Sequence, residues 1–194
     1  PVHPRNPTVV FTAKTMIAAA MNPCKCGFFP DLGKCRCTPT QIRRYLNRVS
    51  GPFLDRIDIG VEVPRQDLGM MAAEKSIDEG SFPQTEQRNS SAVMRARVME
   101  ARARQEKRFA DESISYNSQM TRRQIEEYCR LSGEDAVFLE KVERQQGISA
   151  RGHGKILKVA RTLADLDGQA EIGRTQLAEA IGFRSFEKKY WGSL

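Results

Sequence analysis

The sequence has few aromatic residues and no long apolar run, and each shortage argues against a class of protein. Only 7% of the 194 residues are aromatic, so stacking platforms for single-stranded nucleic acid are not evident. No apolar run approaches the roughly 20 residues that cross a bilayer, which argues against a membrane partner. The first residues, PVHPRNPTVV, lack both the basic-then-apolar order of a secretion signal and an initiator methionine. We therefore expect a cytoplasmic protein, and the missing methionine favours a piece of a longer one.

Positive charge is what the chain has in excess. Lys and Arg number 31 against 24 Asp and Glu, which gives a formal net charge of +7. A basic chain suits a polyanionic partner such as nucleic acid or a nucleotide, although an ordinary solvated surface explains the charge equally well. With 40% hydrophobic residues, the chain has enough apolar material for one ordinary domain or two small ones.

The hydrophobic pattern predicts an α/β part followed by an all-α part. Residues 8–20, TVVFTAKTMIAAA, and the alternating residues 57–63 are typical of strands, with a helix from Pro39 to about Gly51 between them. Residues 65–91 are poor in apolar side chains and suggest a linker. Capping residues and a 3.6-residue period predict helices over 91–109, 121–129, 132–147, 149–168 and 175–182. The expected domains are therefore residues 1–64, the linker 65–91, and residues 92–194.

Four cysteines lie close together near the start of the chain and form two C-x-C pairs. A reducing compartment makes clustered thiols better metal ligands than disulfide partners, and four sulfur ligands suit a structural, tetrahedral zinc ion. C-x-C is tighter than the usual C-x-x-C, so free thiols or a disulfide stay open as alternatives. The predicted ligands are Cys24, Cys26, Cys35 and Cys37, whereas Cys129 fits a helix core.

Two polar residues at the ends of the predicted strands are candidate site residues. Asn22 is either a turn former before Pro23 or a side chain held at the edge of a parallel sheet where ligands bind. Arg56 either pairs with Asp55 or Asp58, or projects from a rigid turn toward a neighbouring subunit.

Arg151 is a third candidate, because it opens a helix that Ser149 is expected to cap. Arg151, Lys155 and Lys158 share one face opposite the apolar stripe. That face is either simply solvated or, at the positive end of the helix dipole, able to meet a phosphate.

Several motifs occur in an order that we recognise. AAAMNPCKCG, CRC, YLNRVSGPFLDRIDIGVEV, ISARGHGKILKVARTLADLDG and LAEAIGF together resemble the magnesium-chelatase-like AAA+ ATPases of the bacterial competence-protein (ComM or YifB) type. The resemblance covers nearly the whole chain and is weakest over residues 65–91. It implies the trailing part of an AAA+ core, with strands, a cysteine hairpin and a helix, followed by a helical lid domain.

The resemblance also implies roles for the three candidates. Asn22 would be sensor 1, which helps to orient the water that attacks the γ-phosphate of ATP. Arg56 would be the arginine finger that reaches the nucleotide of the neighbouring subunit, and Arg151 would be sensor 2 on the lid. Such groups act by positioning and by opposing the negative charge that develops in phosphoryl transfer. A finger acting in trans needs an oligomer, and the family implies a hexameric ring.

The chain departs from a complete ATPase of this family in two respects. It contains no G-x-x-x-x-G-K-[ST] loop and no apolar strand that ends in paired acidic residues for magnesium. Both would lie upstream in the full protein, which would supply most contacts to ATP and Mg²⁺. We therefore expect this chain alone neither to bind ATP tightly nor to hydrolyse it.

The cysteine loop favours DNA over a chelatase partner. True magnesium-chelatase motor subunits carry an acidic Asn-Pro-Glu-Glu-like sequence where this chain has NPCKCG, and the basic residues Lys25, Lys34 and Arg36 suit nucleic acid. Competence-type relatives are thought to drive branch migration in natural transformation. Arg97 and Arg104 of the Arg-rich helix are further DNA-binding candidates. The alternatives are a chelatase motor subunit that remodels a protein partner, and a zinc-containing nucleic-acid-binding module with vestigial ATPase residues.

Overall fold

The structure, a computed structural model, describes residues 15–63 and 90–192. The chain divides into two compact units, Pro1–Leu46 and Asn47–Leu194, which are described separately. Among the described residues, no helix is both long and apolar enough to cross a membrane. The predicted linker lies almost wholly outside the described residues, so the predicted domain boundaries stay predictions.

The described part of the first unit, residues 15–46, consists of an irregular segment and one helix, α1 (Pro39–Leu46). Thr38 caps this helix: its backbone N–H donates to Gln41 Oε1 at 3.0 Å, and its Oγ1 accepts from the Gln41 N–H at 3.3 Å. The helix ends before the predicted Gly51. A separate short helix, α2 (Gly51–Leu54), begins the second unit after the N-cap Ser50.

The predicted strands are not confirmed. The described part of the first strand, residues 15–20, is exposed and irregular, and residues 57–63 also form no strand. A β-strand needs a neighbouring strand to take its backbone hydrogen bonds, and no segment within 15–63 or 90–192 offers one. Gly60 instead donates its N–H to the Phe183 carbonyl at 2.9 Å. The all-α part of the predicted fold class is therefore found, whereas the α/β part is not.

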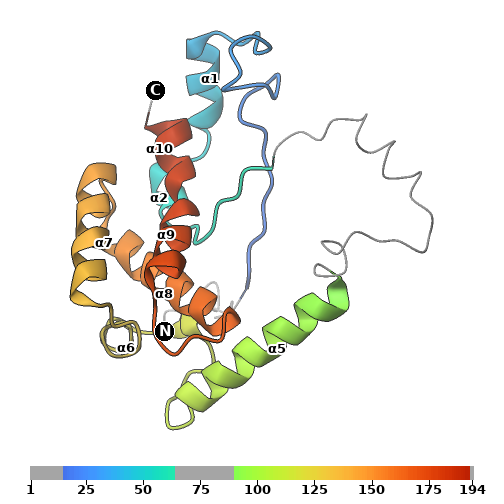
Figure 1. Cartoon of the computed structure of the whole chain (residues 1–194). Coiled ribbons are helices and arrows are strands. Elements are labelled where there is room, and N and C mark those ends of the chain that lie inside the picture. The colour runs from blue at the N-terminus through green and yellow to red at the C-terminus, as the bar shows by residue number, and fades with distance from the viewer. Residues whose placement is uncertain (1–14, 64–89, 193–194) are drawn as a thin grey trace, which may run out of the picture. The chain divides into compact units, whose positions relative to one another are not determined.

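Helices make up most of the second unit (Figure 1). After α2 they are α5 (Ser91–Arg108), the 3₁₀ turn η1 (Asn117–Gln119), α6 (Arg122–Tyr128), α7 (Gly133–Gln146), α8 (Ala150–Leu166), α9 (Arg174–Gly182) and α10 (Ser185–Trp191). Thr121, Ser132 and Ser149 cap α6, α7 and α8 as predicted, and Gly147 ends α7 with a φ of 68°. The sequence did not predict η1 or α10.

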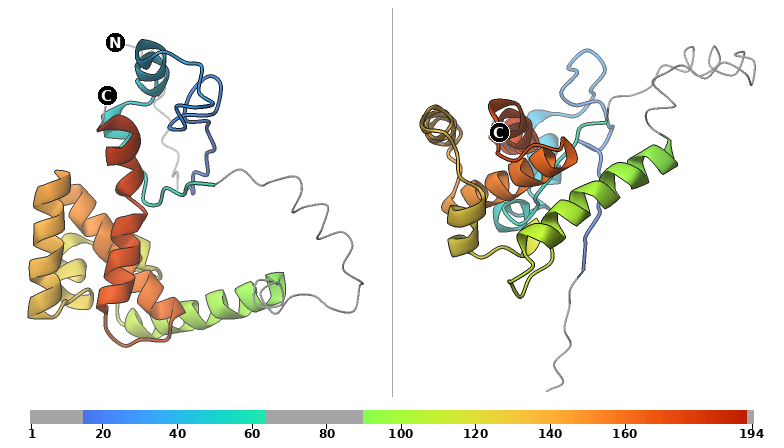
Figure 2. Two further views of the ribbon diagram at one scale, coloured as in Figure 1. Left: turned by 45° about the horizontal axis from the view of Figure 1, so that its top comes forward. Right: turned by 60° about the horizontal axis from the view of Figure 1, so that its bottom comes forward.

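Helix α8 is the centre of this unit. It contacts α5, η1, α6 and α9, and it contributes Ile156, Leu157, Ala160 and Ala164 to the apolar core. The N-terminal half of α5 extends beyond the other helices of the unit in both views of Figure 2, and residues 91–100 are all exposed. Among the described residues, the core therefore holds only the C-terminal half of α5.

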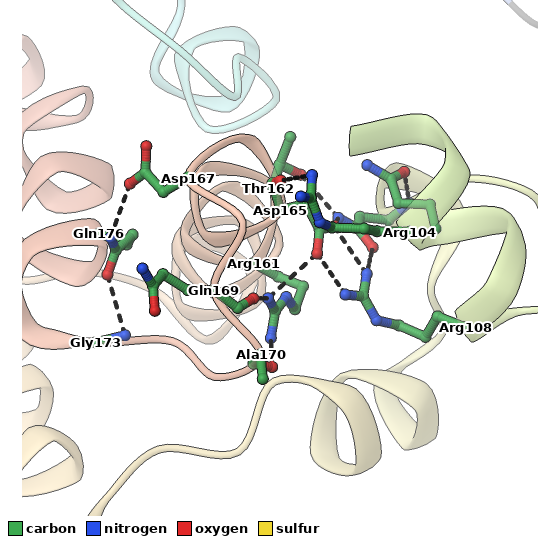
Figure 3. Close-up of polar contacts among 12 residues, drawn as sticks. Arg104, Arg108, Arg161, Thr162, Asp165, Asp167, Gln169, Ala170, Gly173 and Gln176 are labelled. Carbon is green, nitrogen blue, oxygen red and sulfur yellow. Dashed lines mark hydrogen bonds and ion pairs between the residues drawn. The ribbon is translucent and has the colours of Figure 1, made fainter. Parts of the chain in front are cut away.

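A buried charge cluster ties α5 and η1 to the C-terminal half of α8 (Figure 3). Asp165 is completely buried and pairs with Arg108 of α5 and with Arg161, one turn earlier on α8. Its Oδ2 accepts from Asn117 Nδ2 at 2.8 Å, and Asn117 Nδ2 also donates to Thr162 Oγ1 at 3.1 Å. Because each charge in the cluster has an opposite partner, the helices can pack with these groups inside.

Candidate functional site

The thiols of Cys24, Cys26, Cys35 and Cys37 converge in the first unit. All four Sγ atoms lie within 4.8 Å of one another. The separations are 3.4 Å for Cys24 and Cys26, 3.5 Å for Cys26 and Cys35, and 3.8 Å for Cys24 and Cys35. A disulfide would need about 2.05 Å, so these cysteines are free thiols.

Tight turns bring the two C-x-C pairs together. Gly27 adopts a φ of 77°, which favours glycine, and its N–H donates to the Cys24 carbonyl at 3.1 Å. The Phe29 N–H donates to Cys24 Sγ at 3.5 Å. An amide pointed at a sulfur stabilises a thiolate, which is the form that binds metals.

The thiol pKa values differ within the cluster because the four groups compete for negative charge. The hydrogen bond from the Phe28 backbone is the main cause that lowers the pKa of Cys26, to about 6. For Cys35, a backbone hydrogen bond from Cys37 lowers the pKa, but burial and the neighbouring thiols Cys26 and Cys24 together raise it to about 12. Four thiolates at this spacing need a cation between them.

The donor set fits zinc. Four sulfurs at about 2.3 Å from a tetrahedral Zn²⁺ lie about 3.8 Å apart, close to the separations found here. Cys24 is fully buried, and the other three are partly buried. Four protein ligands close the coordination shell, so such an ion would be structural.

Asn22 lies in the same unit, just before the cysteine loop. Its side chain is exposed. It follows an irregular segment rather than the predicted buried strand, so the sheet edge that would hold it is not found among the described residues. Its assignment as sensor 1 stays a prediction.

In the second unit, the structure brings Arg56 and Arg151 onto neighbouring elements. Arg56 follows α2, and its Nη1 donates to the Pro52 carbonyl, which folds the exposed side chain over its own turn. Arg151 lies in the first turn of α8, where its Nη1 is 3.4 Å from Asp55 Oδ2. The predicted sensor 2, Arg151, therefore contacts Asp55, which directly precedes the predicted finger, Arg56, in the sequence.

Asp55 thus links the turn that carries Arg56 to Arg151. The sequence indicated it only as an alternative partner of Arg56. Its Oδ1 accepts from Ser149 Oγ at 3.0 Å, and the buried Arg184 Nη2 lies 4.0 Å away. Burial raises the pKa of Asp55, but the hydrogen bonds from Ser149 and Arg151, together with the charges of Arg151 and Arg184, lower it below its ordinary value. Asp55 is therefore an ionised group near the N-terminus of α8, where the helix dipole favours negative charge.

The three cations of the predicted basic face of α8 contact different groups. Lys155 Nζ is 2.8 Å from Asp58 Oδ1 and also donates to the Arg56 carbonyl. Lys158 Nζ instead donates to the Ser118 carbonyl at 2.9 Å, and burial lowers its pKa. Of the three cations, Arg151 has the side chain open enough to meet a phosphate, with 60% of its surface exposed.

The DNA-binding candidates lie on both units. Lys25, Lys34 and Arg36 are exposed on the cysteine loop, with Lys34 3.9 Å from Asp31. Arg97 is on the exposed half of α5, whereas Arg104 donates to the Asp165 carbonyl at 2.9 Å. The guanidinium of Arg104 is thus partly used to hold α5 against α8.

Two known family models match the chain. Residues 88–184 match the family described as magnesium chelatase, subunit ChlI C-terminal, and residues 2–71 match magnesium chelatase, subunit ChlI. The chain belongs to the magnesium-chelatase-like family of the ComM and YifB type. The family resemblance drawn from the motifs is thereby confirmed.

Individual relatives extend the match over nearly the whole chain. Competence protein ComM of Haemophilus influenzae is 39% identical over 181 residues, which are 93% of this chain and 32% of that protein. YifB, an uncharacterized protein of Escherichia coli, is 38% identical over 180 residues, again 93% of this chain and 33% of the relative. The chain thus spans about a third of the length of these relatives.

Proposed function

We propose that this chain is the sensor-1, arginine-finger and lid portion of a hexameric AAA+ ATPase of the cytoplasm, which couples ATP hydrolysis to DNA remodelling such as branch migration. Asn22, Arg56 and Arg151 act on the nucleotide in this scheme. The P-loop and most of the contacts to ATP and Mg²⁺ come from the rest of the full-length protein, and the isolated chain is inactive.

The observation that carries the proposal is that two exposed arginines, Arg56 and Arg151, lie on adjoining elements of one unit. Within residues 15–63 and 90–192, Arg151 is held by one 3.4 Å contact with Asp55, and its side chain is 60% exposed. Because exposed ion pairs contribute little, a phosphate can displace Asp55. Among the described residues, the Arg56 guanidinium bonds only the Pro52 carbonyl of its own turn, which leaves it able to reach out of the unit. Two arginines available in this way suit charge stabilisation in phosphoryl transfer.

Exposed apolar residues near these arginines support an assembly larger than the chain. Ile59, Val61 and Val63 are 50%, 67% and 86% exposed on the segment that follows Arg56. Apolar side chains on a segment of alternating pattern are typical of a strand that completes a sheet. We infer that these residues pack against other parts of the full-length ATPase.

The cysteine loop supports DNA as the partner. A structural zinc ion would stiffen a loop that presents Lys25, Lys34 and Arg36 to solvent, and cations on a stiff loop suit phosphate contacts. The name of the ComM relative, a competence protein, points the same way. The family model, named for magnesium chelatase, favours the alternative of a motor subunit that remodels a protein partner.

The test measures ATP turnover by the full-length protein without DNA, with linear duplex and with a branched junction. We expect the junction to stimulate turnover, and Arg56→Ala to lower it by roughly a thousandfold, the scale of a lost arginine finger. Arg144→Ala is the matched control, because Arg144 is exposed and pairs only with Glu140 among the described residues. Turnover that is indifferent to DNA would favour the chelatase-like alternative, and full activity of Arg56→Ala would refute the finger assignment.

A further inference from the structure

The turn that carries Arg56 is bonded to the helical part of the second unit at four consecutive residues. Asp55 accepts from Ser149, and Asp58 pairs with Lys155. The two residues between them are held through their carbonyls. The Arg56 carbonyl accepts from Lys155 Nζ, and the Ile57 carbonyl accepts from Arg184 Nη1 at 2.7 Å.

Lys155 and Arg184 make these bonds from well-covered positions. The Lys155 side chain is 16% exposed and that of Arg184 is 4% exposed. Lys155 belongs to the second turn of α8, whereas Arg184 lies between α9 and α10 and also bonds Glu187. The turn is therefore fastened to two separate parts of the helical region, and hydrogen bonds from charged donors are among the stronger ones.

This arrangement has a consequence for the two arginines. Arg151 is one helical turn before Lys155 on the same helix, and Arg56 supplies the carbonyl that Lys155 binds. A displacement of the start of α8 is thus passed directly to the turn that carries Arg56. A flexible linker between them would not pass it on.

We propose that Lys155 and Arg184 are positioning residues that lock the turn 54–58 to the lid, so that Arg56 and Arg151 move as one body. The proposal rests on the proposed function, and it adds that nucleotide contact with Arg151 sets the position of Arg56 toward the neighbouring subunit. Neither residue touches the nucleotide in this scheme. Their effect on turnover passes through Arg56.

The first experiment is independent of catalysis. Hydrogen exchange of this chain is compared for wild type, Lys155→Met and the control Lys141→Met, which makes the same change at an exposed lysine of α7. We expect the Arg56 and Ile57 amides, which donate to Phe53 and Leu54, to exchange about tenfold faster in Lys155→Met and unchanged in the control. Unchanged exchange of these amides in Lys155→Met would overturn the lock.

The second experiment measures the kcat and KM of the full-length protein in two backgrounds. In the presence of Arg56, Lys155→Met is expected to lower kcat on the order of tenfold with little change in KM, since displaced catalytic groups cost this much or more. In the Arg56→Ala background the same substitution should have no further effect. An equal loss in both backgrounds, or no loss in either, would overturn the positioning role.

Arg184→Met provides the same comparison from the other fastening point. Because Arg184 is nearly buried, the variant is accepted only if its circular dichroism and melting temperature match those of wild type, and Lys155→Met decides the question otherwise. If the wild-type full-length protein hydrolyses no ATP, the proposed function fails. The exchange experiment then still decides whether the lock exists.

Discussion

Replacing Asp165 by alanine should strongly lower the free energy of unfolding of the helical unit. Asp165 is completely buried, and the substitution would leave the side chains of Arg161 and Arg108, which are 3% and 16% exposed, without their shared carboxylate. Breaking a buried ion pair from one side costs about 3 to 5 kcal/mol. Arg161 is already strained electrostatically, because burial lowers its pKa and Asp165 is the main group that opposes this.

The expected loss of stability is large enough to measure by urea unfolding. With an m value of about 1.5 kcal/mol/M, a loss of about 3 kcal/mol moves the urea midpoint down by about 2 M, which circular dichroism of the chain resolves readily. Glu140→Ala is the control, since Glu140 forms an exposed pair with Arg144 and should change stability by less than about 0.5 kcal/mol. Adding Arg161→Met to Asp165→Ala should restore part of the loss, because it removes an uncompensated buried charge.

Two results would refute this reasoning about the cluster in Figure 3. One is a cost below about 1 kcal/mol for Asp165→Ala, which would mean that the arginines reach water without disturbing the helices. The other is a double variant that is less stable than Asp165→Ala alone. In that case Arg161 would act through its hydrogen bonds to the Gln169 and Ala170 carbonyls rather than through its charge.

Two further predictions concern the metal and acid stability. The purified chain should contain one zinc ion per molecule, lost with a strong chelator and absent in Cys24→Ser but retained in Cys129→Ser; equal zinc in all three would exclude the thiol site. The hydrogen bond from Arg174 is the main cause that lowers the pKa of Asp135. The stability that this bond contributes is fully present above the pKa of Asp135 in the unfolded chain, about 3.9. It is lost as the pH falls through the lower pKa of the folded state. Arg174→Met should therefore flatten the acid limb of a stability–pH curve below about pH 4, and Arg122→Met should not.

The helices of the second unit were largely predictable from the sequence because their signals are local. Thr121, Ser132 and Ser149 each donate or accept within one helical turn, and the period of Ile156 and Ala160 needs only the helix itself. The C-x-C pairs likewise brought their thiols together as expected, since glycine turns and short spacing leave them few alternatives. The 3₁₀ turn η1 and helix α10 were missed because η1 is only three residues long and α10 has no side-chain cap at its start.

The predicted strands show the limit of local pattern. The alternation of Ile57, Ile59, Val61 and Val63 is a property of the sequence, but a strand exists only when a second segment accepts its hydrogen bonds. Among residues 15–63 and 90–192 no such segment lies beside them, and Gly60 bonds a helix end instead. The alternating pattern thus shows that the segment is suited to a strand, but a strand forms only where a second segment pairs with it.

By itself, the sequence determined the family, the helices of the second unit, the thiol set and the identity of the candidate arginines, because each depends on residue type and short spacing. Only the tertiary structure decided which charges act together. Asp55 lies 96 positions before Arg151, and Arg184 lies 127 positions after Ile57, yet each pair is in contact. Contacts across such separations depend on how α8, α9 and α10 pack around the turn, and no local pattern in the chain encodes that packing.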